Sequence, residues 1–146
     1  MGFTTPAFIR KNTPELRKKL EKLGYNHPTD VIEDERFCIA TSPVNCNYHI
    51  IIKGAFDATN PYRTWNCAGR IDCGTNEELF ISLAALRDDT DNNQLFTNGK
   101  GDWGIYRDNY REGGLPGMDF YGIPNDFEID NYHKAIVNEL IEHFKV

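Results

Sequence analysis

The clearest apolar pattern in the chain is a leucine stripe near its start. Three leucines recur with the i, i+4, i+7 spacing of one helical face, at Leu16, Leu20 and Leu23. Thr13 can accept hydrogen bonds from the free amides of the first turn, Pro14 suits the first helical position, and Gly24 suits a left-handed stop. These signals predict a helix over residues 14–23.

Two further segments have helical patterns. Residues 76–87 are apolar around most of the helical circumference, which is typical of a buried central helix. Thr75 and Glu78 match a capping box at its start. The second segment, residues 132–144, has one apolar face, made of Ile136, Val137, Leu140, Ile141 and Phe144. Both segments are predicted to form helices.

Short β-branched and aromatic runs between turn residues predict strands. These runs are 36–41, 48–53, a third within 64–72, 94–97 and 102–106. Pro43 separates the first two, and Asn98 with Gly99 separates the last two, so each pair is expected to form a hairpin. Residues 1–12 are expected to be an extended entry segment anchored by Phe8 and Ile9. The longest stretch without periodicity, residues 107–128, is expected to be a loop.

The order of these elements does not alternate strictly between strand and helix. A parallel sheet would require such alternation, so the sequence favours the α+β class. We expect one domain over residues 1–146, with a mainly antiparallel sheet of about four to five strands packed by the three helices.

Composition and charge narrow the classes of function. The chain has 146 residues, with 16 Lys and Arg against 22 Asp and Glu, for a net charge of −6. This balance disfavours nonspecific binding to nucleic acid or to an anionic membrane, because both need a basic face. The sequence shows neither an apolar run long enough to cross a membrane nor a secretory signal pattern, so a cytoplasmic location is expected.

Metal and phosphate motifs fail on their spacing. The four cysteines, at 38, 46, 67 and 73, lie too far apart for a zinc knuckle and are expected to be free thiols. The run from Asp89 to Asn93 resembles the start of a calcium loop but lacks the required later Gly and Glu. Lys100 lacks the surrounding pattern of a phosphate-binding loop. No metal and no cofactor are therefore expected.

One cysteine is a candidate for catalysis. Cys73 precedes the start of the predicted central helix, where the pKa of a thiol can be lowered. A thiol enzyme would also need a nearby histidine, and His49 and His133 are the possible partners. The alternative interpretation is a structural thiol, and no other catalytic group is expected.

Five residues are candidates for binding a ligand or a partner. The segment 62–70 carries two arginines and two aromatic residues, a composition typical of contact hot spots. A stacking and clamping site for a phosphorylated ring could combine Arg63, Trp65, Arg70, Trp103 and Tyr106. The alternative interpretation places Trp65 in the core and pairs the arginines with nearby acidic residues.

Three blocks of the chain carry a resemblance to other proteins. They are residues 8–25 (FIRKNTPELRKKLEKLGY), 64–80 (TWNCAGRIDCGTNEELF) continuing through 84–89 (AALRDD), and 133–144 (HKAIVNELIEHF). These blocks resemble a set of small uncharacterised proteins from gut Bacteroidetes and their phages or integrated elements. The set has no established activity, so the resemblance assigns no catalytic residue. Its pattern implies Thr as a helix cap where this chain has Ile136, so the last helix is expected to start earlier.

Three hypotheses for the function follow. The first is a non-enzymatic cytoplasmic interaction module, of phage or mobile-element origin, that binds a host protein. The alternative is a module that binds a nucleotide-like small molecule, and the second alternative is a thiol-dependent enzyme that uses Cys73. The glycine-rich and aromatic stretch 98–130 matches the resembling set least, so partner specificity is expected there. The oligomeric state stays open.

Overall fold

A computed structural model describes residues 2–26, 34, 37–52, 69–107 and 117–145. The described chain contains three helices: α1 (Pro14–Leu23), α2 (Glu77–Ala84) and α3 (Val137–His143). The strands of the first sheet are β1 (Ala7–Ile9), β2 (Phe37–Ser42), β3 (Asn47–Ile52) and β4 (Ile71–Asp72). Those of the second are β5 (Leu95–Thr97), β6 (Trp103–Arg107), β7 (Gly117–Phe120) and β8 (His133–Lys134). The α+β class is confirmed, with two four-stranded sheets in place of the single predicted sheet.

The first sheet is built around the N-terminal strand. Its order is β3-β2-β1-β4, with β1 antiparallel to β2 and parallel to β4. Phe8 and Ile9 are fully buried in β1, so the expected entry segment contains a central strand. The predicted hairpin of β2 and β3 is confirmed, with Phe37 opposite Ile52 and Ser42 opposite Asn47.

The second sheet has the order β7-β6-β5-β8 and is antiparallel throughout. The predicted β5–β6 hairpin is confirmed, and two strands that the sequence did not predict extend it on either side. β7 lies in the stretch 107–128, which was expected to be a loop, and β8 lies in the expected last helix. Strands of two and four residues are too short to show an alternating pattern, so their pairing with β5 and β6 decides their conformation.

The sequence predicts the ends of α1 correctly but not those of α2. In α1, the Thr13 side chain accepts from the Leu16 amide and Gly24 is left-handed, as predicted. In α2, the cap is Asn76, whose side chain accepts from the Leu79 amide at 3.2 Å, so the prediction of Thr75 was wrong. The helix also ends at Ala84, short of residue 87, because Arg87 pairs in an isolated bridge with Phe3.

The last helix begins later than expected. The prediction of residues 132–144 was wrong at its start, because His133 and Lys134 pair with β5. Ile136 occupies the N-cap position and has no side-chain acceptor. The Glu139 carboxylate accepts instead from the Ile136 amide at 3.1 Å and from His133 Nε2 at 2.9 Å. This carboxylate ties the end of β8 to the first turn of α3.

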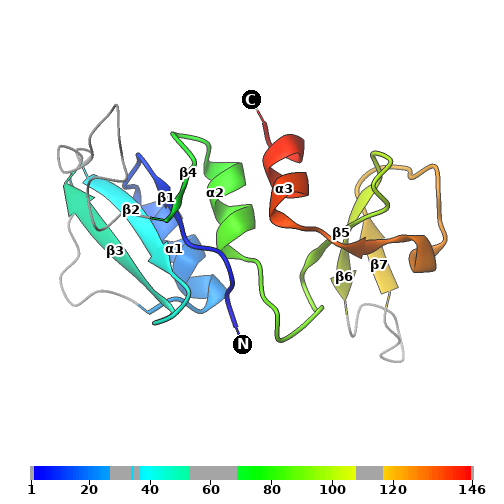
Figure 1. The fold of residues 1–146 in the computed structure, drawn as a ribbon, viewed down its shortest axis with the longest axis horizontal. Coiled ribbons are helices and arrows are strands. Elements are labelled where there is room, and N and C mark those ends of the chain that lie inside the picture. The colour runs from blue at the N-terminus through cyan, green and yellow to red at the C-terminus, as the bar shows by residue number, and fades with distance from the viewer. Residues whose placement is uncertain (1, 27–33, 35–36, 53–68, 108–116, 146) are drawn as a thin grey trace.

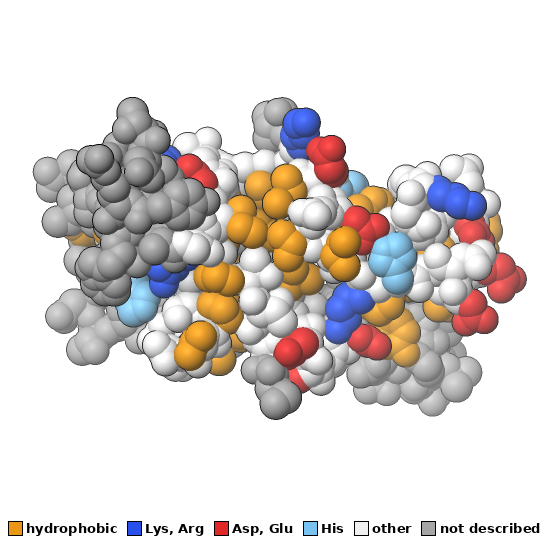
Figure 2. Space-filling model, viewed as in Figure 1, with side chains coloured by type: hydrophobic (Ala, Val, Ile, Leu, Met, Phe, Trp, Pro, Cys, Tyr) orange, Lys and Arg blue, Asp and Glu red, His pale blue; other side chains and the backbone are white. Residues whose placement is uncertain are grey.

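The two sheets lie at opposite ends of the molecule, with α2 and α3 between them (Figure 1). One buried cluster joins both ends, running from Ile9 and Leu16 through Phe80 and Leu83 to Leu140 and Trp103. Hydrophobic side chains also gather on the surface over α2 and α3 (Figure 2). Among the described helices, none is long and apolar enough to cross a membrane.

A lysine fastens the loop that follows α2 to the second sheet. Lys134 Nζ donates to the carbonyl oxygens of Arg87 and Thr90, at 3.0 Å and 2.7 Å, and lies 2.9 Å from the Asp91 carboxylate. The Lys134 ammonium is therefore surrounded by two carbonyl oxygens and one carboxylate. The run from Asp89 to Asn93, which resembles a calcium loop in the sequence, is bound by a cation of the chain itself.

Candidate functional site

The predicted binding residues do not form one site in the described part of the chain. Arg63 and Trp65 lie outside the described residues. Arg70 immediately precedes β4 of the first sheet, where its Nε donates to the Thr41 carbonyl at 3.0 Å. Trp103 and Tyr106 belong to the second sheet, on the strand β6. The structure therefore separates Arg70 from the two aromatic residues.

Trp103 and Tyr106 are also separated from each other. They are three residues apart on one strand, so their side chains point to opposite faces of the sheet. Trp103 is buried and stacks on His143, with ring centroids 4.1 Å apart. Tyr106 packs against Phe96 on the other face, at 5.6 Å. The described residues thus form no clamp for an aromatic ring.

The Cys73 thiol lacks the features of a nucleophile. It is 5% exposed, and its burial raises the pKa of the thiol to about 12, with the Asp72 carboxylate as the second cause. A helix N-terminus would have lowered this pKa. His49 lies on β3, at the far edge of the first sheet with β2 and β1 between it and β4, and His133 lies in the second sheet. Neither histidine is placed to activate the thiol.

This burial predicts slow alkylation of Cys73. At neutral pH a thiol with a pKa near 12 has about a thousandth of the thiolate of an ordinary cysteine, and the rate should rise about tenfold per pH unit. Iodoacetamide labelling read by peptide mass spectrometry measures this, with guanidinium-unfolded protein as the control. Labelling of folded Cys73 at the unfolded rate would contradict the prediction and favour the thiol enzyme.

The described residues contain neither a disulfide nor a metal-binding cluster. Cys38, Cys46 and Cys73 are free thiols there, and Cys67 lies outside the described residues. No group of three or more His, Cys, Asp or Glu residues among those described is placed to hold a metal ion.

An exposed surface lies in residues 117–132, which we name the acidic apolar segment and which overlaps the stretch 98–130 where partner specificity was expected. It comprises β7, the turn that follows it and a short 3-10 turn, Ile129–Asn131. Three large apolar side chains in it are exposed: Tyr121 by 49%, Ile123 by 92% and Phe127 by 66%. Water therefore covers side chains that a folded chain normally buries.

Aromatic packing holds this surface in place. The Phe127 ring meets Phe120 edge to face, with centroids 5.9 Å apart, and the Tyr132 ring lies 5.5 Å from Phe120. Phe127 thus has one contact with the second sheet while most of its surface stays exposed. The exposed side chain is positioned before any partner arrives, which lowers the entropic cost of binding.

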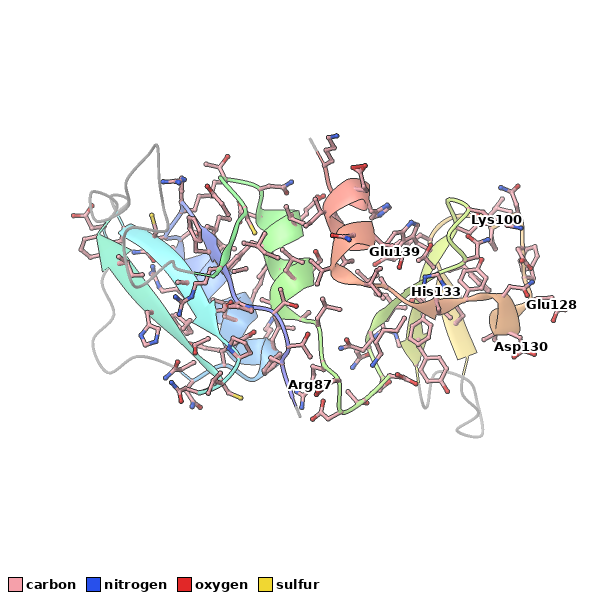
Figure 3. The ribbon with its side chains drawn as sticks, viewed as in Figure 1. Arg87, Lys100, Glu128, Asp130, His133 and Glu139 are labelled. Atoms are coloured by element: carbon pink, nitrogen blue, oxygen red, sulfur yellow. The ribbon has the colours of Figure 1, made fainter. Side chains whose placement is uncertain are left out.

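Hydrogen bonds around Asp126 fix the backbone of the segment. The Asp126 carboxylate accepts from the Glu128 amide at 2.9 Å and from Asn131 Nδ2 at 2.8 Å. The same two bonds lower the pKa of Asp126 below its ordinary value. The Tyr132 hydroxyl donates to the Asp126 carbonyl at 2.7 Å. Glu128 and Asp130 lie at the outer end of the molecule (Figure 3).

An apolar pocket adjoins the segment at Tyr121. It has a volume of about 350 Å³ and lies between α2 and the second sheet. Its apolar walls come from Ile81, Leu95, Ile105, Tyr121 and Phe144. Lys19, Glu77 and Glu78 also line it. Tyr121 therefore belongs both to the pocket and to the exposed surface.

Comparisons with known proteins give no relative for this chain. No protein-family model, no curated protein and no solved structure matches it.

Proposed function

We propose that the protein is a non-enzymatic interaction module that binds a host protein through the acidic apolar segment. The observation that carries this proposal is the exposure of Ile123 and Phe127 in a turn held by hydrogen bonds and aromatic packing. Large exposed apolar side chains, four residues apart in one segment, are typical of binding surfaces. Among the described residues, the separation of Arg70 from Trp103 and Tyr106 weakens the small-molecule alternative, and the burial of Cys73 weakens the thiol-enzyme alternative.

The proposed cellular setting comes from the sequence. The resemblance of residues 8–25, 64–80 and 133–144 to small proteins of gut Bacteroidetes and their phages supports a mobile-element origin and a cytoplasmic host partner. Residues 117–130 of the segment lie within the stretch 98–130, which matches that set least. A surface that adapts to different hosts would vary in this way.

The proposal predicts that Phe127→Ser abolishes capture of the partner. A hot-spot aromatic contributes about 2 kcal/mol or more to binding, so affinity should fall about thirtyfold. A tagged pull-down from host lysate, quantified by mass spectrometry, measures this loss. Val44→Ser is the matched control, because Val44 is 90% exposed in the turn between β2 and β3. Circular dichroism checks that both variants fold.

Two outcomes would overturn the proposal. One is equal recovery of the partner by wild-type protein and Phe127→Ser. The other is the absence of any stoichiometric protein together with a thermal shift produced by a nucleotide, which would favour the small-molecule alternative.

A further inference from the structure

We infer that the partner of the acidic apolar segment is a basic protein surface, whose Lys or Arg side chains flank an apolar anchor. This inference rests on the proposed function and adds the chemistry of the partner. Residues 117–132 contain four carboxylates, Asp119, Asp126, Glu128 and Asp130, and no Lys or Arg. Acidic side chains gather at this end of the molecule, farthest from the first sheet (Figure 2).

Two of the carboxylates lie close to Phe127 along the chain. Glu128 and Asp130 follow Phe127 at alternate positions, and both are exposed. Among the described residues neither forms an ion pair with Lys or Arg, so both charges are available to a partner. Water solvates the two carboxylates in the free protein, and a partner that buries them must supply positive charge in its place.

Among the described residues, the basic groups near the segment offset only part of its negative charge. Arg107 forms an ion pair with Asp119, with a nitrogen–oxygen distance of 3.8 Å. Lys100 lies near enough to Asp126 to contribute to lowering its pKa, but the strongest causes there are hydrogen bonds to Glu128 and Asn131. Among the described residues, Glu128 and Asp130 therefore leave the segment with a net negative charge beside Phe127.

The negative charge of the segment favours some classes of binding partner over others. Nucleic acid and anionic membranes carry phosphate and would be repelled. A second copy of the chain would bring an equally acidic segment, on a molecule with a net charge of −6. A basic protein surface gains both the apolar contact and the charge attraction, and the attraction also accelerates encounter.

A defined probe tests the inference. We would titrate the full chain into a short fluorescein-labelled peptide in which Lys alternates with Leu, and into its twin with Glu in place of Lys. Fluorescence anisotropy should show binding of the Lys peptide alone. Its Kd should rise at least about tenfold between about 50 mM and 500 mM salt, because screening weakens exposed charges.

Charge reversal with a matched control makes the test specific. The double variant Glu128→Lys with Asp130→Lys should weaken binding of the Lys peptide by about tenfold or more. Glu15→Lys with Glu142→Lys changes the net charge equally outside the segment and should change the Kd less than about threefold. An equal loss in both double variants, or equal binding of both peptides, would overturn the inference.

The outcomes also separate this inference from the proposed function. If Phe127→Ser abolishes capture of the host protein but charge reversal changes neither that capture nor peptide binding, the contact surface stands and the basic partner is wrong. If charge reversal weakens capture of the host protein but Phe127→Ser does not, the proposed apolar contact is wrong. Dimerisation that strengthens with salt and is lost in Phe127→Ser, measured by light scattering, would replace the basic partner with a second copy.

Discussion

Phe80→Ala should lower the free energy of unfolding by about 3–5 kcal/mol, the largest loss we expect from a single substitution. Phe80 is fully buried in α2, the helix that contacts α1 and β1 on one side and α3 on the other. Removing the ring forfeits its burial and leaves a cavity that three elements would have to close. Urea denaturation followed by circular dichroism measures the change.

Ile123→Ala is the control for this prediction. Ile123 is also a large apolar residue but is 92% exposed, so its truncation should change stability by less than about 0.5 kcal/mol. Equal losses from the two substitutions would contradict the assignment of Phe80 to the core and of Ile123 to the surface. A stable Phe80→Ala protein would mean that α2 does not join the two sheets through its buried face.

Gly104→Ala is the second substitution expected to have a large effect, at about 1–3 kcal/mol of destabilisation. A Cβ atom at Gly104 would lie 2.7 Å from Met118 Cγ and 3.1 Å from the Asp119 carbonyl oxygen. The methyl group would force β7 away from β6, which are paired at Gly104 and Phe120. Chemical denaturation again provides the measurement.

A double-mutant cycle tests the cause of that loss. Met118→Ala removes the atoms that the new methyl group would meet, so the double variant should be less destabilised than the sum of the two single variants. Strict additivity would mean that overpacking against Met118 does not explain the cost. The Gly104→Ala variant is used only for stability measurements, because β7 is part of the acidic apolar segment and a shift of β7 would also alter binding.

The extent to which the sequence predicts the fold depends on how local each signal is. α1 is predicted residue for residue, because Thr13, Pro14 and Gly24 act within their own turns. The two hairpins are predicted because each pairs neighbouring strands. β1, β7 and β8 have only two to four residues. The partners of β1 and β8 lie far along the chain, whereas β7 pairs with the preceding strand β6. No local pattern indicates such pairing, so the division into two sheets could not be predicted.

The site is harder to predict for a different reason. The sequence shows that the region from Trp103 to Phe127 is aromatic, but aromatic composition does not distinguish a packed ring from an exposed one. The structure separates them: Trp103 is buried against His143, whereas Phe127 is 66% exposed. The exposure of Phe127 depends on β7 and on the bonds of Asp126, and neither has a sequence signal.

The central claim is that Phe127 contacts a host protein. Site-specific photocrosslinking in living host cells tests it most directly, with a benzophenone amino acid placed at Phe127 in one variant and at Val44 in another. Both positions are exposed apolar sites on turns, by 66% and 90%. We predict one discrete crosslinked protein from position 127 and none from position 44. The same adducts from both positions, or none from position 127, would contradict the claim.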